Sequence, residues 1–152
     1  MDTQIETLYE QDYVAWLDLT LNQLKQQDFS GLDWENLIEE IDALGREQRH
    51  KVESCLLRLL LHLLLYQYWD IERQWSGKGW EKEIDNFRLE LDFLLESQVL
   101  YNYFLSILEK DYGKARKLAI KKSNLASSTF PEVCPYTPEQ ILDFGWLPQS
   151  II

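Results

Sequence analysis

Hydrophobic residues recur at helical intervals along most of this 152-residue chain, a pattern that predicts a protein built from α-helices. The expected helices cover about residues 7–27, 34–70, 80–96 and 99–122, followed by a short last helix over 138–144. No segment shows the sustained alternation that is typical of a β-strand. We therefore expect an all-α fold, a bundle of four main helices plus a short C-terminal helix, in a single domain over residues 1–152.

The second expected helix changes character along its length. In its first half the apolar residues share one face, as in an amphipathic helix that packs one side against a core. From Leu56 onward leucines point in every direction, which indicates a helix surrounded by protein or lipid. The apolar run over residues 55–66 is shorter than the roughly 20 residues of a membrane span, and it contains Arg58 and His62. A core helix without a membrane span is expected, with Gly45 marking either a kink or a break between two helices.

Residues with strong capping preferences stand at several expected helix ends. Asp33 is a good N-cap for the long helix, and Ser97 for the fourth one. Thr137 and Gln140 have the spacing of a capping box, with Pro138 at the first helical position. These signals place the helix starts more firmly than the apolar pattern alone.

Charge and cysteine content restrict the classes of function. The formal net charge of −11 disfavours binding to nucleic acid or to an anionic membrane. The two cysteines have no metal-site spacing, and the acidic N-terminal residues do not resemble a secretion signal, so we expect reduced thiols in a cytoplasmic protein. Residues 110–122 have a net charge of +5, from six basic residues and one aspartate. This segment is either a solvated helix face or an anion-binding patch, which would consist of Lys114, Arg116, Lys117, Lys121 and Lys122.

Two polar side chains interrupt the leucine-rich part of the long helix. A guanidinium among leucines needs acceptors, so Arg58 is expected in a buried ion pair with a carboxylate of another helix. His62 is expected at the edge of the core, either hydrogen-bonded as a structural histidine or acting as a proton shuttle or single ligand. The Glu47–His50 spacing is found in di-metal bundles, but these need two such motifs, and the chain has only two histidines. We therefore predict no metal site and no cofactor.

Four sequence words occur together in a specific order: LYEQDYVAWL, LDWENLIEEIDALGR, LLLHLLLYQYW and FPEVCPYTPEQIL. Over about residues 8–148 the chain resembles the bacterial family known as domain of unknown function 29, which is abundant in cyanobacteria. The resemblance implies an all-helical domain, and it does not assign a catalytic role to any residue. It makes Asp12, Glu39, Glu40 and His62 the preferred polar positions for a functional site.

The leading functional hypothesis is a non-enzymatic helical protein that acts through protein–protein contact, as a homodimer or with another protein. It depends on the apolar residues at 56–69, the 13% of aromatic residues and the lack of a catalytic motif. The alternative is a metal- or small-molecule-dependent enzyme whose site lies between the first two helices and contains Asp12, Glu39, Glu40 and His62. A third reading is anion binding by the basic residues of 110–122.

Overall fold

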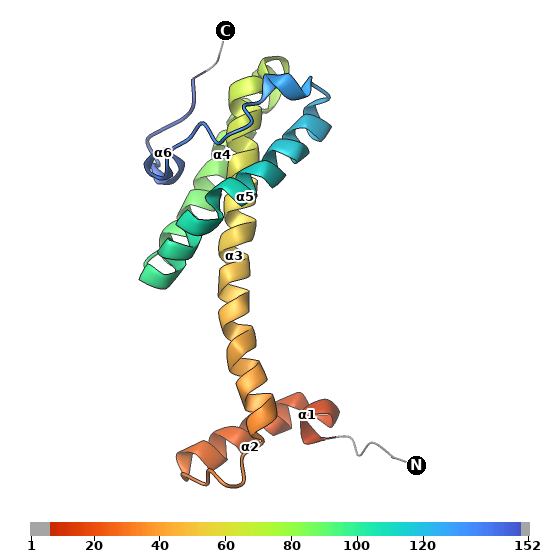
Figure 1. The fold of residues 1–152 in the computed structure, drawn as a ribbon, viewed down its shortest axis with the longest axis vertical. Coiled ribbons are helices and arrows are strands. Elements are labelled where there is room, and N and C mark those ends of the chain that lie inside the picture. Colours follow the sequence, from red (N-terminus) through yellow and green to blue (C-terminus); the bar gives the residue numbers. More distant parts are fainter. Residues whose placement is uncertain (1–6, 150–152) are drawn as a thin grey trace. The chain divides into compact units, whose positions relative to one another are not determined.

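The computed structural model describes residues 7–149 (Figure 1). Within this range it contains helices and no strand, which confirms the all-α prediction. The elements are α1 (Leu8–Gln11), α2 (Tyr13–Lys25), α3 (Trp34–Tyr68), α4 (Asp70–Leu94), α5 (Gln98–Ser123), a 3₁₀ turn (Ser127–Thr129) and α6 (Pro138–Leu142). None of these helices combines the length and the hydropathy that crossing a lipid bilayer requires.

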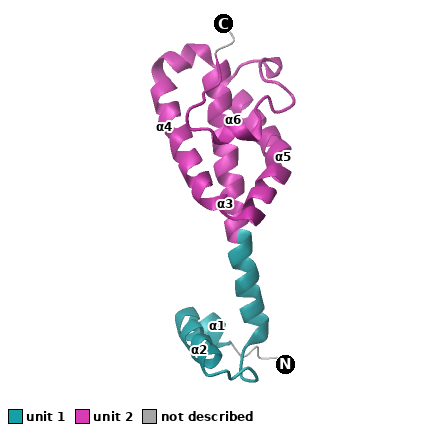
Figure 2. Cartoon of the chain, turned by 90° about the vertical axis from the view of Figure 1, so that its left-hand side faces the viewer, with its two compact units in different colours: residues 1–46 teal, residues 47–152 magenta. Residues whose placement is uncertain are grey.

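The chain divides into two compact units (Figure 2). Unit 1 is Met1–Arg46, of which residues 7–46 are described, and unit 2 is Glu47–Ile152, described as far as residue 149. Helix α3 contributes its first residues to unit 1 and the remainder to unit 2. It is helical through Gly45, so the break that the sequence left open does not occur.

Unit 2 contains the main hydrophobic core. Helices α4 and α5 lie on either side of the second half of α3, and α6 packs across them (Figure 2). The residues of α3 that the sequence showed to be apolar all round are enclosed by these neighbours, with 0% exposure of Leu56, Leu59, Leu60, Leu63, Leu64 and Leu65. Burial of a leucine side chain contributes about 1.5–3 kcal/mol, so this part of α3 is the centre of the fold's stability.

Helix α4 begins ten residues before its predicted start at Trp80. It runs from Asp70 straight through the segment SGKG at 76–79, which lies between the helices predicted over 34–70 and 80–96. Each glycine costs a helix about 1 kcal/mol relative to alanine, but tertiary packing overrides such propensities. Gly77 is buried in the helix, and the ring of Trp80 stacks on Trp69 with centroids 5.9 Å apart. The extra turns therefore lie against the core, where packing offsets the cost of the glycines.

The single helix predicted over 7–27 is two helices, because Asp12 interrupts it. Asp12 has an extended backbone (φ −151°, ψ 92°) that ends α1, and its carboxylate accepts a hydrogen bond from the Ala15 backbone N–H at 3.1 Å. Asp12 therefore acts as the N-cap of α2. Aspartate is a favoured N-cap, and here the local capping interaction prevails over the continuous apolar pattern.

The predicted caps at Asp33, Ser97 and Thr137 are present. Ser97 accepts from the Leu100 N–H, and Thr137 and Gln140 form the complete capping box of α6. Asp33 also does more than cap α3. Its carboxylate accepts from the backbone N–H and side-chain amide of Asn36 and from the indole N–H of Trp16. It thereby fixes the one buried tryptophan of α2 against the start of α3.

Candidate functional site

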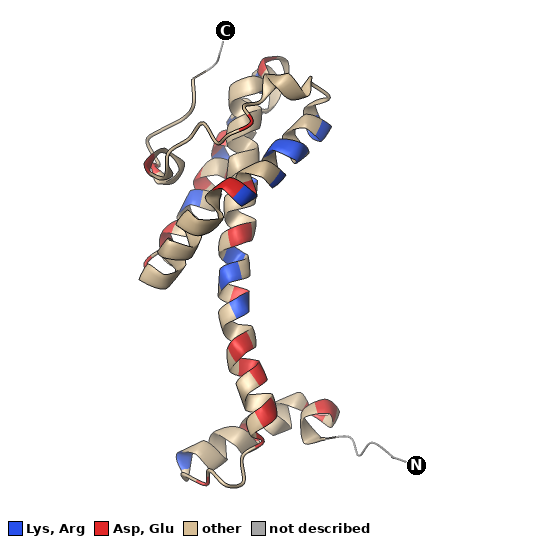
Figure 3. Ribbon diagram, viewed as in Figure 1, with Lys and Arg blue, Asp and Glu red and all other residues tan. Residues whose placement is uncertain are grey.

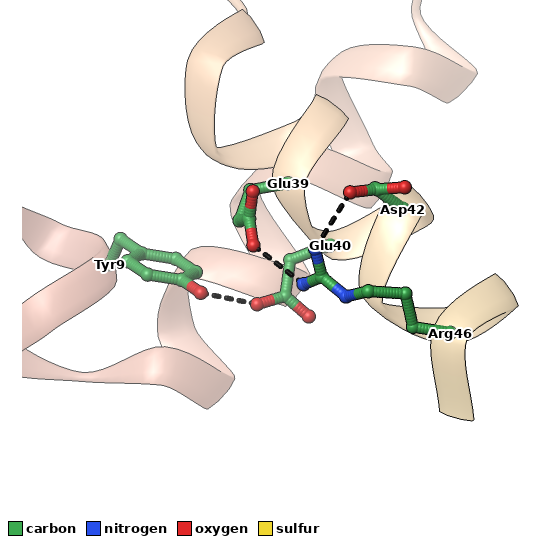
Figure 4. Close-up of polar contacts among 5 residues, drawn as sticks. All are labelled: Tyr9, Glu39, Glu40, Asp42 and Arg46. Atoms are coloured by element: carbon green, nitrogen blue, oxygen red, sulfur yellow. Dashed lines mark hydrogen bonds and ion pairs between the residues drawn. The ribbon is translucent and has the colours of Figure 1, made fainter. Parts of the chain in front are cut away.

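Glu40 forms a polar cluster with two tyrosines in unit 1. The hydroxyl of Tyr13 donates to one oxygen of the Glu40 carboxylate at 2.6 Å, and that of Tyr9 donates to the other. Figure 4 shows the Glu40 side chain turned toward Tyr9, whereas the neighbouring Glu39 contacts Arg46. The tyrosine rings pack edge to face, with centroids 5.6 Å apart. One carboxylate thus ties α1 and α2 to α3.

The hydrogen bonds of this cluster decide which protonation states it favours. Donation from Tyr13 and Tyr9 to the carboxylate lowers the pKa of Glu40. The same bond to Glu40 raises the pKa of Tyr9 to about 12, and the pKa of Tyr13 is also raised. General acid–base catalysis is most efficient when the pKa lies near the working pH. An ionised Glu40 beside two protonated phenols is therefore suited to holding helices together rather than to proton transfer.

Glu39 and Asp12, the two other candidates in unit 1, have separate partners. Glu39 and Asp42 both contact the guanidinium of Arg46, each at 2.8 Å, as Figure 4 shows. The side chains of this trio are about 60% exposed, so the pairs contribute little to stability. Asp12 caps α2. The three carboxylates that the enzyme hypothesis grouped together thus make three different sets of hydrogen bonds.

His62 lies in unit 2, where it is half-buried. Its Nδ1–H donates to the backbone carbonyl of Arg58 at 2.7 Å, and its ring is 5.5 Å from that of Phe87. Burial is the main cause that lowers the pKa of His62. The hydrogen bond to the Arg58 carbonyl opposes this shift, and the positive charge of Lys122 adds to it. These contacts favour the structural alternative for His62, a neutral histidine hydrogen-bonded at the edge of the core. Its described polar contacts do not involve Asp12, Glu39 or Glu40.

The expectation of a buried ion pair at Arg58 is wrong. The side chain is exposed, and within residues 7–149 it makes no ion pair. The reason is its angle on α3, because residues 59 and 60 face the core while residue 58 points away from it. Arg58 has leucines as neighbours in the sequence, but in the helix those leucines face the core and Arg58 does not.

The basic residues of α5 differ in what they contact. Arg116 donates to the backbone carbonyls of Ser127 and Phe130, at 2.8 and 3.2 Å, and so holds the chain that follows α5. The four lysines of the proposed anion-binding patch remain exposed, and they lie in the C-terminal half of α5 (Figure 3): Lys114, Lys117, Lys121 and Lys122. Lys121 and Lys122 occupy the last helical turn, where positive charge interacts favourably with the helix dipole. A structural role therefore accounts for three of the five proposed anion-binding residues.

An apolar groove of about 330 Å³ crosses unit 1 between α2 and α3. Leu17, Leu21 and Leu24 of α2 face Leu37, Ile41 and Leu44 of α3 across it, and Glu40 and Tyr13 lie at its polar edge. The α3 face that the sequence assigned to the core is open here. Ile38, Ile41 and Leu44 are 60–63% exposed.

Unit 1 has a very small hydrophobic core of its own. Among its described residues only Trp16, Leu32 and Thr20 are buried. Units of this size usually need an added staple, metal or partner to be stable. Residues 7–46 also carry nine acidic and two basic residues, a net charge of −7. Unit 1 therefore presents an apolar groove within an acidic surface.

Two buried charged residues of unit 2 were missed by the sequence reasoning. Arg88 is 1% exposed and donates to the backbone carbonyls of Gln140, Ile141 and Trp146, at 2.8–3.1 Å. Asp111 is 3% exposed, and its Oδ2 accepts no hydrogen bond within the described part of the chain. Both residues lie on amphipathic helices. The sequence signal that could have identified them is a charged residue at a position of the helical period that otherwise holds apolar core residues.

Among residues 7–149 no three His, Cys, Asp or Glu side chains are placed so that they could share a metal ion. Neither a comparison with curated proteins nor one with solved structures gave a match. The family model described as domain of unknown function DUF29 matches residues 8–147. That range includes the tyrosine–glutamate cluster, the groove and every helix described above, and the chain belongs to the DUF29 family.

Proposed function

We propose that this protein is a non-enzymatic, cytoplasmic interaction protein, and that the groove of unit 1 receives an amphipathic helix of another protein. The observation that carries the proposal is the exposed apolar face of α3 at Ile38, Ile41 and Leu44, which continues into the apolar face of α2. Monomeric soluble proteins rarely expose contiguous apolar patches of this kind. A helix laid into a groove is a common way to cover one.

The class of function is the one expected from the sequence, but the apolar surface that supports it is a different one. The apolar residues at 56–69 were the original reason to expect a partner, but most of the leucines among them are buried in the core of unit 2. The apolar surface that is exposed lies in the N-terminal part of α3, at Ile38, Ile41 and Leu44. Two free cysteines, neither in a disulfide, support the cytoplasmic part of the proposal.

Charge favours a basic partner over a second copy of the chain. Two copies joined through this face would bring together two surfaces of net charge −7 each. Charged residues around an interface select partners by complementarity, and juxtaposed like charges disfavour association. A helix with leucine-type residues on one face would cover the apolar walls of the groove, and Lys or Arg at its flanks would complement the acidic surface around it.

The polar groups near the groove support binding rather than catalysis. Glu40 is held by two phenols whose pKa is raised, so neither partner is prepared to exchange a proton near neutral pH. The cluster instead fixes the angle between α2 and α3, the two walls of the groove. A preformed groove loses less entropy on binding than a flexible one.

The test uses the full chain and three designed helical peptides. The first carries Leu at positions i, i+3, i+4 and i+7 with flanking Lys, the second replaces each Lys by Glu, and the third is a scramble of the first. Fluorescence anisotropy should detect saturable binding of the basic amphipathic peptide only. Ile41→Gln should weaken that binding by about tenfold, since it removes an apolar side chain worth roughly 1.4 kcal/mol when covered.

Ile71→Gln is the matched control, because Ile71 is 76% exposed and belongs to unit 2. It should leave peptide affinity unchanged. Sedimentation equilibrium on the free protein addresses the alternative occupant. A dimer that Ile41→Gln converts to a monomer, together with no peptide binding, would replace the basic partner by a second copy of this chain.

A further inference from the structure

A second recess lies entirely within unit 2, between α3 and α4. It has a volume of about 410 Å³, within the range of about 300–1,000 Å³ that is typical of small-molecule sites. Lys51, Cys55 and Arg58 of α3 form one wall, and Glu90, Phe93 and Leu94 of α4 form the other. The interaction proposed for unit 1 does not involve any of these side chains.

The floor of the recess is closed by a thiol–carboxylate pair. Cys55 is 6% exposed, and its Sγ–H donates to Oε2 of Glu90 at 2.7 Å. Burial is the first cause that raises the pKa of the thiol to about 12, and the bond to Glu90 is the second. The thiol therefore stays protonated. Its hydrogen bond occupies one oxygen of Glu90, the only acidic side chain among the described residues that line the recess. Nucleophilic chemistry at Cys55 is disfavoured, because the thiolate is the reactive form.

The two cations of the recess are available to a ligand. Arg58 is exposed and has no ion pair within the described residues. The Lys51 ammonium is 3.8 Å from Glu47, and both of those side chains are more than half exposed, so this pair is weak. Positions 51 and 58 are seven residues apart on α3, which places both side chains on the same face. Positive charge thus collects at one recess of a protein whose net charge is −11.

The opposite wall supplies the apolar part. Phe93 is 66% exposed in the recess wall, and Leu94 beside it is half-buried. A planar guanidinium that faces an apolar surface is suited to a carboxylate, which it binds through two parallel hydrogen bonds. We propose that this recess binds a small organic carboxylate with an apolar body. The carboxylate contacts Arg58 and Lys51, and the hydrocarbon part lies over Phe93 and Leu94.

The experiment titrates the full-length protein with four probes by isothermal calorimetry. Decanoate has both features, acetate has the charge without the chain, decanol has the chain without the charge, and decyltrimethylammonium has the opposite charge. Decanoate, kept below its micelle concentration, should bind at one site and more tightly than the other three. Backbone amide shifts in nuclear magnetic resonance should change over residues 50–58 and 90–94 on adding it.

Matched variants locate the site. Arg58→Gln and Phe93→Ala should each weaken decanoate binding by at least about tenfold. Lys82→Gln and Leu89→Ala, which alter exposed side chains of α4 outside the recess, should not. All four positions are exposed, so the variants are expected to fold.

Three results would overturn the proposal. One is the absence of decanoate binding. The second is equal binding of decanoate and decanol with no effect of Arg58→Gln, which would indicate adsorption to apolar surface. The third is loss of decanoate binding in Ile41→Gln, which would place the carboxylate in the groove of unit 1. The proposed peptide binding is measured separately, so either proposal can fail while the other stands.

Discussion

Asp111 offers the sharpest test of the energetics of unit 2. It lies on α5, 3% exposed, with Oδ2 lacking a hydrogen-bond partner among the described residues. Burial raises the pKa of its carboxyl to about 6. The negative charge of Glu53 on α3 acts in the same direction, and the positive charges of Lys110 and Lys114 on α5 oppose it. A shift of about 2 units from the ordinary value corresponds to roughly 3 kcal/mol.

The sign of the effect follows from proton linkage. Because the folded chain holds this proton more tightly than the unfolded chain, the stabilising contribution is complete below the unfolded pKa of 3.8. It is lost as the pH rises through the folded value of about 6. The ionised carboxylate at neutral pH is therefore a cost to folding. Roughly 2 kcal/mol of that cost develops between about pH 4.5 and about pH 7.5.

Asp111→Asn removes the titrating proton and keeps the shape of the side chain. We expect the free energy of unfolding of this variant, relative to the wild type, to rise by about 2 kcal/mol between about pH 4.5 and about pH 7.5. Urea denaturation followed by circular dichroism at both pH values provides the measurement. Any fixed cost of the amide is the same at both pH values and cancels from the comparison.

Asp92→Asn is the control, since it removes one negative charge from an exposed position of unit 2. Its relative stability should change much less over the same pH interval. If the difference between Asp111→Asn and the wild type were constant with pH, the burial argument for Asp111 would be refuted.

Three further changes test other parts of the structure. Arg88→Met should lower the free energy of unfolding by at least about 2 kcal/mol in urea denaturation, since three backbone carbonyls lose their donor; a loss below about 0.5 kcal/mol would contradict this. Glu40→Ala should speed amide hydrogen exchange over residues 8–25, because α1 and α2 lose their shared acceptor on α3, and unchanged exchange would count against that role. Thr137→Ala should cost about 1 kcal/mol of local stability in α6, seen as faster exchange over residues 138–142 only.

Most of the fold prediction depended on the helical periodicity of the apolar residues. The long helix, the fourth helix and the last helix were expected at nearly their observed bounds, because each combines a strong apolar pattern with a recognisable start. The errors lie where two local signals compete. At Asp12 a capping side chain divided an unbroken apolar pattern, and at Gly77 packing kept a helix intact through glycines.

The candidate site was predictable only as a set of unusual residues. Glu40 was singled out from the sequence, but its two phenol partners are 27 and 31 residues away along the chain. Arg58 was expected to be buried because its sequence neighbours are leucines, whereas its position on the helix turns it outward. Arg88, placed in the interior, gave no comparable sequence signal.

Local sequence patterns were enough to predict that this chain is all helical, where most of its long helices run and how most of them start. Those features depend on interactions within a few residues, and a 3.6-residue period and a capping side chain are visible in the sequence. Which apolar faces are covered, in contrast, could be read only from the packing of the helices. Within unit 2, α4 and α5 enclose the apolar stripe of α3 from about Val52 onward, whereas in unit 1 Ile38 and Ile41 of the same helix are exposed. Burial depends on what a helix packs against, and that is set by residues far away in the chain.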